Sequence, residues 1–122
     1  MSSQEPTREE MQREYYRTRL QSDHPIHLIA SITLLKTEEG GRINPVCSGY
    51  RGQFHYDDHD WDAIYTFATD AEIEPEETSE AMIQLMSPWE HSGRLVEGKE
   101  FLVREGPTIV ARGLITWVDG EL

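Results

Sequence analysis

The run from His55 to Asp60, which reads HYDDHD, contains the densest set of side chains able to bind a metal ion. On a single β-strand, His55, Asp57 and His59 would project to one side, and imidazole with carboxylate suits a divalent transition metal. A strand separates such alternate side chains by about 7 Å, however, which is too far to chelate one ion without a bend. We therefore interpret the run as the solvent-facing end of a strand and predict no metal.

Catalysis by a nucleophile has little support in the sequence. Cys47 is the only cysteine, so no disulfide can form within the chain. A pairing with His27 or His91 is conceivable, but Val46 precedes Cys47, and a lone cysteine in such a setting is typically a small buried hydrophobic residue. The phosphate-binding motif Gly-x-x-x-x-Gly-Lys-Ser/Thr does not occur. We predict that the protein is not an enzyme and binds no nucleotide or other cofactor.

Charge is the second strong property of the chain. Eleven lysine and arginine residues face 23 aspartate and glutamate residues, giving a net charge of −12. Residues 57–80 contain ten acids and no lysine or arginine. Such a chain repels phosphate backbones, so nucleic acid would need a local basic patch. The acidic run is either a solvated surface, a docking surface for a basic partner or a mimic of a polyanion.

Targeting signals are also missing from the sequence. No apolar stretch approaches the ~18 residues needed to span a bilayer. The N-terminal residues lack the apolar core of a secretory signal. Together with the single cysteine, this predicts a cytoplasmic protein without membrane contact.

Short runs of β-forming residues, separated by turn residues, make up most of the chain. They predict six strands, at residues 27–35, 50–59, 61–69, 81–87, 99–104 and 108–118. Short strands at this spacing, with glycine, proline and asparagine between them, favour a closed or nearly closed antiparallel barrel. The predicted fold is therefore all-β, a six-stranded antiparallel barrel.

The first 22 residues differ from the rest. Thr7 and Glu10 match a capping box, and the spacing predicts a helix from about Arg8 to Leu20. Its apolar stripe is formed by Met11, Tyr15, Tyr16 and Leu20. A lone helix of this length is marginal in water, so the stripe must pack on the barrel or on a partner. We divide the chain into an N-terminal arm, 1–22, helical or partly disordered, and a barrel domain, 23–122.

Three motifs connect the barrel to a known family. The run from Glu38 to Tyr56 reads EEGGRINPVCSGYRGQFHY, the run 104–106 reads REG, and an apolar tail covers 109–118. In order and spacing they resemble the C-terminal domain, the third domain, of elongation factor Tu, over roughly residues 26–118. The resemblance implies that domain's six-stranded barrel as a free-standing copy, without the GTPase part of the factor.

The same resemblance implies a set of site residues. In the family, the Gly-Gly-Arg loop and the strand start after it lie near the surface that meets the T-stem of aminoacyl-tRNA, which corresponds to Arg42, Arg51 and Gln53. Asp57 and Asp58, however, stand where the family usually has arginine and threonine, and their charge weakens any phosphate contact. Alternatively, the two arginines pair with nearby acids and tie the loop to the barrel.

These observations leave two functions open. We expect a non-catalytic, translation-related binding module that contacts a protein partner, with Trp89, Met11 and Tyr15 as contact residues. Trp89 lies in a loop, SPWEHSG, where the family has a shorter one, and an exposed tryptophan is a typical contact anchor. The alternative is a tRNA-binding or translation accessory protein that uses the family's T-stem surface.

Overall fold

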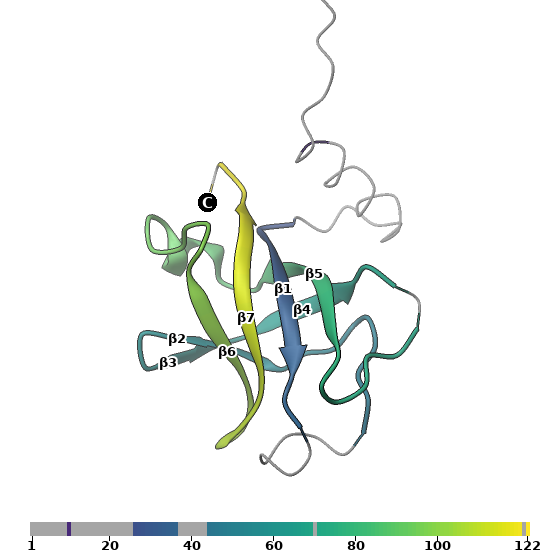
Figure 1. The fold of residues 1–122 in the computed structure, drawn as a ribbon. Helices are drawn as coiled ribbons and strands as arrows, with labels where there is room; N and C mark the ends of the chain where they lie inside the picture. Colours follow the sequence, from purple (N-terminus) through teal and green to yellow (C-terminus); the bar gives the residue numbers. More distant parts are fainter. Residues whose placement is uncertain (1–9, 11–25, 37–43, 70, 121) are drawn as a thin grey trace, which may run out of the picture.

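The computed structural model describes residues 10, 26–36, 44–69, 71–120 and 122. They form one curled antiparallel sheet of seven strands, in the order β3-β2-β6-β7-β1-β5-β4 (Figure 1). The elements are β1 (Leu28–Leu34), β2 (Gln53–Tyr56), β3 (His59–Trp61), β4 (Ala63–Phe67), β5 (Thr78–Leu85), the 3-10 turn η2 (Pro88–His91), β6 (Glu100–Glu105) and β7 (Thr108–Val118). The predicted all-β antiparallel barrel is confirmed; the predicted arm, 1–22, lies outside the described residues except for Glu10.

The structure has one strand more than the sequence predicts, because the expected strand at 50–59 is a hairpin. Asp57 and Asp58 both have positive φ, 49° and 62°. Positive φ at both central residues is the signature of a two-residue turn that joins paired strands, and aspartate tolerates this conformation. Consequently His55 and Asp60 are opposite each other on β2 and β3, and the idea of one strand carrying His55, Asp57 and His59 on one side was wrong.

The core fills the inner face of the curled sheet. On β4, which lies within the strand predicted at 61–69, Ala63, Tyr65 and Phe67 are buried and the residues between them are half-buried. Phe54 on β2 stacks on Phe101 of β6, with 4.3 Å between the ring centroids. Because each strand presents alternate residues inward, these large rings meet in the interior and hold the strands together.

A second, smaller apolar cluster lies on the outer face. Ile29 of β1 is paired with Met82 of β5 on one side and with Trp117 of β7 on the other. Cross-strand partners share a face, and a bulge between Ile29 and Ala30 places Trp117 on this face. With Ile26 they form a buried cluster separate from the main core.

An isolated bridge connects the segment just before β2 to β4, the last strand of the order, through Tyr50 and Tyr65. Gly49 donates its N–H to the Tyr65 carbonyl at 2.8 Å, and Tyr65 donates its N–H to the Tyr50 carbonyl at 2.9 Å. The Tyr50 hydroxyl also donates to the Glu105 carboxylate at the end of β6. Tyr50 therefore joins β4 to β6 and closes the barrel.

Gly52 is required at this crossing. A Cβ atom there would lie 2.6 Å from the Tyr50 ring and 2.6 Å from Cγ1 of Val103. Val103 is buried and the Tyr50 ring is held by its hydroxyl, so neither can move aside cheaply. Only glycine lets the chain cross from β4 to β6 this closely.

We predict that Gly52→Ala lowers the free energy of unfolding by roughly 1–3 kcal/mol, the usual effect of overpacking a buried site. Urea unfolding followed by tryptophan fluorescence measures it. Gly120→Ala is the matched control, since a Cβ at Gly120 meets nothing within 4 Å. Equal unfolding midpoints for the two variants would contradict the role given to Gly52.

Candidate binding surface

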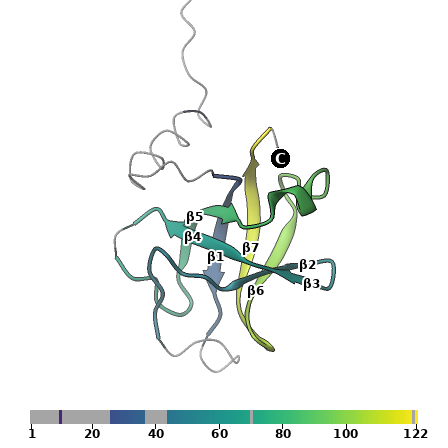
Figure 2. The ribbon, with the colours of Figure 1, turned by 180° about the vertical axis from the view of Figure 1, so that it is seen from behind.

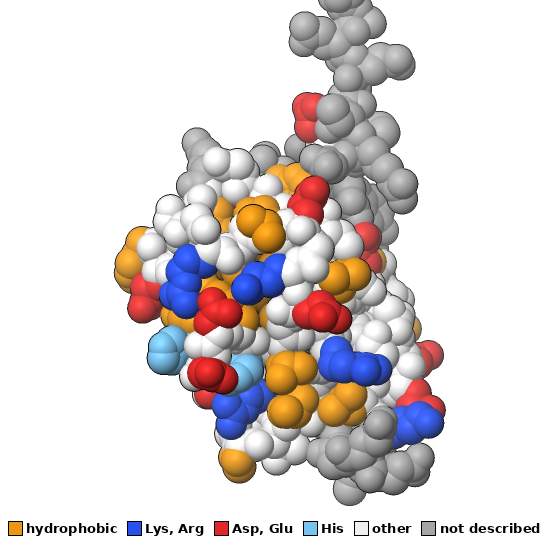
Figure 3. Space-filling model, turned by 60° about the vertical axis from the view of Figure 1, so that its left-hand side comes forward, with side chains coloured by type: hydrophobic (Ala, Val, Ile, Leu, Met, Phe, Trp, Pro, Cys, Tyr) orange, Lys and Arg blue, Asp and Glu red, His pale blue; other side chains and the backbone are white. Residues whose placement is uncertain are grey.

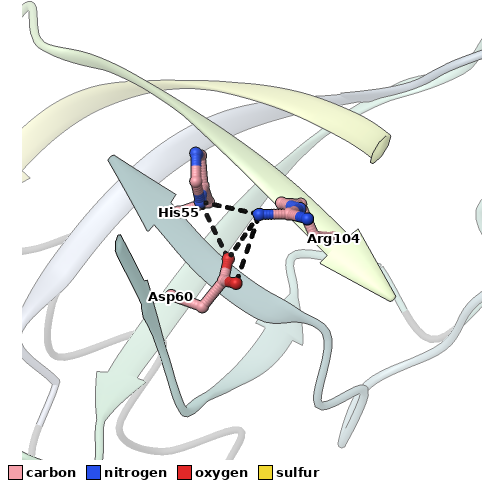
Figure 4. A network of polar contacts seen from close by, with 3 residues as sticks. All are labelled: His55, Asp60 and Arg104. Carbon is pink, nitrogen blue, oxygen red and sulfur yellow. Dashed lines mark hydrogen bonds and ion pairs between the residues drawn. The ribbon is translucent and has the colours of Figure 1, made fainter. Parts of the chain in front are cut away.

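The β2–β3 hairpin projects sideways from the barrel, and a polar network fixes its outer face to β6 (Figures 1, 2 and 4). His55 Nδ1 lies 2.8 Å from Asp60 Oδ1, and Arg104 Nη1 lies 3.2 Å from Asp60 Oδ2. The three side chains come from β2, β3 and β6 respectively. Each contact is partly exposed and contributes modestly, but together they set the direction in which the hairpin points.

The residues predicted from the family surface are only partly brought together. Gln53 is paired with Arg104 on β6, and its Oε1 atom is buried without a hydrogen bond from any described residue. Arg51 is exposed and forms no ion pair with the described part of the chain. Arg42, Met11 and Tyr15 lie outside the described residues, so their predicted roles stay predictions.

The tip of the hairpin carries a charged cluster that sequence analysis missed. The Asp57 carboxylate lies 3.4 Å from Nη2 of Arg94 and 3.5 Å from Nζ of Lys99. Arg94 comes from the loop after η2, and Lys99 immediately precedes β6. One turn carboxylate therefore connects three separate segments of the chain.

Aromatic rings lie directly beneath these two cations. Tyr56 and Trp61 stack with 4.4 Å between their centroids. The Arg94 guanidinium lies 5.1 Å from the Tyr56 centroid and 5.2 Å from that of Trp61, and the Lys99 ammonium lies 5.3 Å from that of Tyr56. These distances are within the range of favourable cation–π contact. The hairpin tip is thus a site where cations bind to aromatic faces and one carboxylate.

The η2 turn presents its two aromatic side chains in opposite directions. His91 is completely buried, and its Nδ1 lies 2.6 Å from the Tyr56 hydroxyl. Trp89, by contrast, is 73% exposed, as expected for a residue of this loop. His91 therefore anchors the turn on the aromatic rings, while Trp89, two residues earlier, faces solvent.

A groove of about 430 Å³ lies beside the hairpin tip and runs over the outer face of β6 towards β7. Its lining includes acids at the hairpin end, Asp57 and Asp58, with Glu100 nearby, and the base Arg112 from β7. Figure 3 shows this side of the molecule, where acidic, basic and histidine side chains alternate with apolar ones. The groove is therefore a mixed-charge contact surface rather than a basic one.

Cys47 is exposed, so the expectation that it is buried was wrong. The neighbouring Val46 pairs with Ile73 in an isolated bridge, through backbone hydrogen bonds of 3.0 and 2.7 Å, and both of those side chains are buried. Because successive side chains in extended backbone point to opposite sides, the burial of Val46 turns Cys47 outward.

The fold and this surface define a small antiparallel barrel module with a mixed-charge groove beside its β2–β3 hairpin. The chain belongs to the family of the elongation factor Tu C-terminal domain, since a family model of that description matches residues 24–119. The resemblance noted in the sequence is thereby confirmed. Within the described part of the chain, no helix has the length and apolar character needed to cross a lipid bilayer.

Two buried histidines make the stability of the module sensitive to pH. Burial lowers the pKa of His91 below 6.5, and nearby Arg94 adds to this, while Glu90 opposes it. Burial also lowers the pKa of His27, against the opposing charge of Asp119. His27 Nδ1 accepts a hydrogen bond of 2.9 Å from the Leu85 N–H, which a proton on that nitrogen would abolish.

We predict that the free energy of unfolding falls as the pH drops below about 6.5, because the unfolded chain then binds protons at both imidazoles before the folded chain does. His27→Asn and His91→Asn should each flatten this dependence while keeping an acceptor near Nδ1. Urea midpoints between about pH 7.5 and pH 5 measure it, and acids common to all variants cancel in the comparison. If the urea midpoints of the variants and the wild type fall equally between about pH 7.5 and pH 5, the role given to these histidines is contradicted.

Proposed function

We propose that this protein is a non-catalytic binding module that contacts a protein partner through the hairpin tip and η2. The observation that carries the proposal is Trp89, a tryptophan 73% exposed on a turn that His91 anchors to the aromatic rings. Contact residues of this kind, large and held rigid before binding, dominate the affinity of protein–protein interfaces.

The family supports a binding role over a catalytic one, because its members' C-terminal domain is a β-barrel without the nucleotide site of the factor. The sequence of this chain likewise has no phosphate-binding loop. We therefore propose that the protein is not an enzyme, binds no nucleotide and works in the cytoplasm, in a process related to translation.

Charge favours a protein partner over RNA. Two of the described arginines are neutralised by aspartates, Arg94 by Asp57 and Arg104 by Asp60. With a net charge of −12, little positive potential is left to attract a phosphate backbone. The second candidate, tRNA binding, depends on Arg42, the exposed Arg51 and Gln53.

We predict that tagged protein captures a partner from an extract of its source cells, and that nuclease treatment leaves the capture unchanged. Trp89→Ala should weaken the purified complex by about 2 kcal/mol or more, as expected for a contact at the centre of an interface. Isothermal titration calorimetry measures the difference.

Ile109→Ala is the matched control for this experiment. Ile109 is also exposed, at 40%, but it lies next to the β6–β7 turn, at the other end of the barrel from η2 (Figure 1). Equal affinity of both variants and wild type would contradict the proposed surface. Loss of capture on nuclease treatment, together with a sub-micromolar tRNA complex weakened by Arg51→Ala, would favour the RNA-binding alternative.

A further inference from the structure

The hairpin tip combines aromatic faces with a carboxylate, the groups that bind a cationic side chain. In this structure Arg94 and Lys99 of the same chain occupy these groups. Tyr56 and Trp61 supply stacked aromatic faces, and Asp57 supplies the carboxylate. Arg94 lies over both rings and contacts the carboxylate at once. Aromatic faces combined with a carboxylate are the groups that proteins use to bind ammonium and guanidinium groups.

The resident cations are held loosely. Arg94 Nη2 is 3.4 Å from Asp57, and Arg94 Nη1 is 3.4 Å from the Glu90 carbonyl, both longer than a well-formed charged hydrogen bond. Lys99 is 3.5 Å from the same carboxylate. The Asp57 side chain is 51% exposed, so water competes for it. Partly exposed ion pairs of this kind contribute little to stability.

The surroundings favour the approach of a further cation. Acids outnumber lysine and arginine in the groove lining by one, with Asp57, Asp58 and Glu100 against Lys99 and Arg112. The groove leads away from Asp57 along β6 and has a volume of about 430 Å³. The whole chain carries a net charge of −12, so its long-range field attracts positive charge.

We propose that the hairpin tip receives a lysine or arginine side chain from a basic segment of the protein partner, which displaces Arg94 from Asp57 and from the Tyr56 and Trp61 rings. The adjoining partner backbone lies in the groove over β6, and Trp89 contacts the partner beside it. This inference rests on the proposed function and specifies its partner chemistry: a cationic, extended protein segment.

The test uses the full chain and a short probe, the capped peptide acetyl-Gly-Arg-Gly-amide, followed by two-dimensional NMR of the backbone amides and tryptophan indoles. The peptide should shift the Trp61 indole and the amides of Asp57, Asp58 and Lys99. The matched peptide with citrulline in place of arginine has a similar shape but no charge. It should leave these NMR signals unchanged.

Two variants distinguish the effect of the competing Arg94 side chain from that of the Asp57 carboxylate. Arg94→Gln should tighten the peptide complex roughly threefold or more, because the competing cation is gone. Asp57→Asn should weaken it roughly fivefold, the value of one partly exposed charge contact. Asparagine adopts positive φ as readily as aspartate, so this variant keeps the turn. Glu72→Gln removes the same charge outside the groove lining and should change the affinity far less.

The proposal is overturned if the citrulline peptide produces the same shifts, if Arg94→Gln fails to tighten binding, or if Glu72→Gln weakens binding as much as Asp57→Asn. Spermidine that binds the hairpin tip while the arginine peptide does not would also overturn it, in favour of a free polyamine. A captured partner that depends on Trp89 but not on Asp57 would contradict this inference and leave the proposed function standing.

Discussion

The curled shape of the sheet depends on the crossing at Gly49–Gly52, where the chain passes from one end of the sheet to the other. Two backbone hydrogen bonds to Tyr65 attach this segment to β4, and the Tyr50 hydroxyl ties it to Glu105 at the end of β6. A sheet left open would expose unpaired strand edges to other chains. The crossing is possible because Gly52 has no side chain to collide with the Tyr50 ring and Val103.

Closure at this point determines where the contact surface forms. With Tyr50 paired to β4 and Gln53–Tyr56 paired to β6, the hairpin that follows must leave the barrel sideways. The inner side of that hairpin is then covered by η2, through the contact between His91 and Tyr56. Asp57, Arg94 and Lys99 meet over the outer rim of these rings, so the cation site is a consequence of how the barrel closes.

The parts of this arrangement that follow local rules could be predicted from the sequence. The alternation of residues along β4 predicts which of its side chains are buried. Turn residues in the sequence predict where most of the strands end. The hairpin at Asp57-Asp58 was also predictable, since two consecutive aspartates between aromatic residues suit a tight turn, but the run was interpreted as one strand. β5 begins at Thr78 rather than at Ala81, because the backbone of residues 78–80 pairs with β1, and no apolar pattern marks these polar residues.

Other features depend on contacts between distant segments, and local sequence carries no sign of them. His91 packs among Phe54, Tyr56 and Trp61 and bonds to the hydroxyl of Tyr56, 35 residues earlier in the chain. Arg94 stacks on rings from β2 and β3, and its pairing with Asp57 cannot be deduced before the hairpin is known. The residues of the family surface were predicted only in part. The resemblance identified Gln53 and Arg51, but the structure shows that the Gln53 amide oxygen is buried and that Arg51 is exposed.

The central claim is that the acidic hairpin tip faces a basic protein segment. Carbodiimide crosslinking tests it directly, because the reagent couples a carboxylate to a lysine amine only when the two are in contact. The account predicts crosslinks from Asp57 or Asp58 to lysines of one partner protein, identified by mass spectrometry and reduced in Trp89→Ala. Crosslinks that avoid the hairpin, or contacts to RNA around Arg51 after ultraviolet irradiation instead, would contradict it.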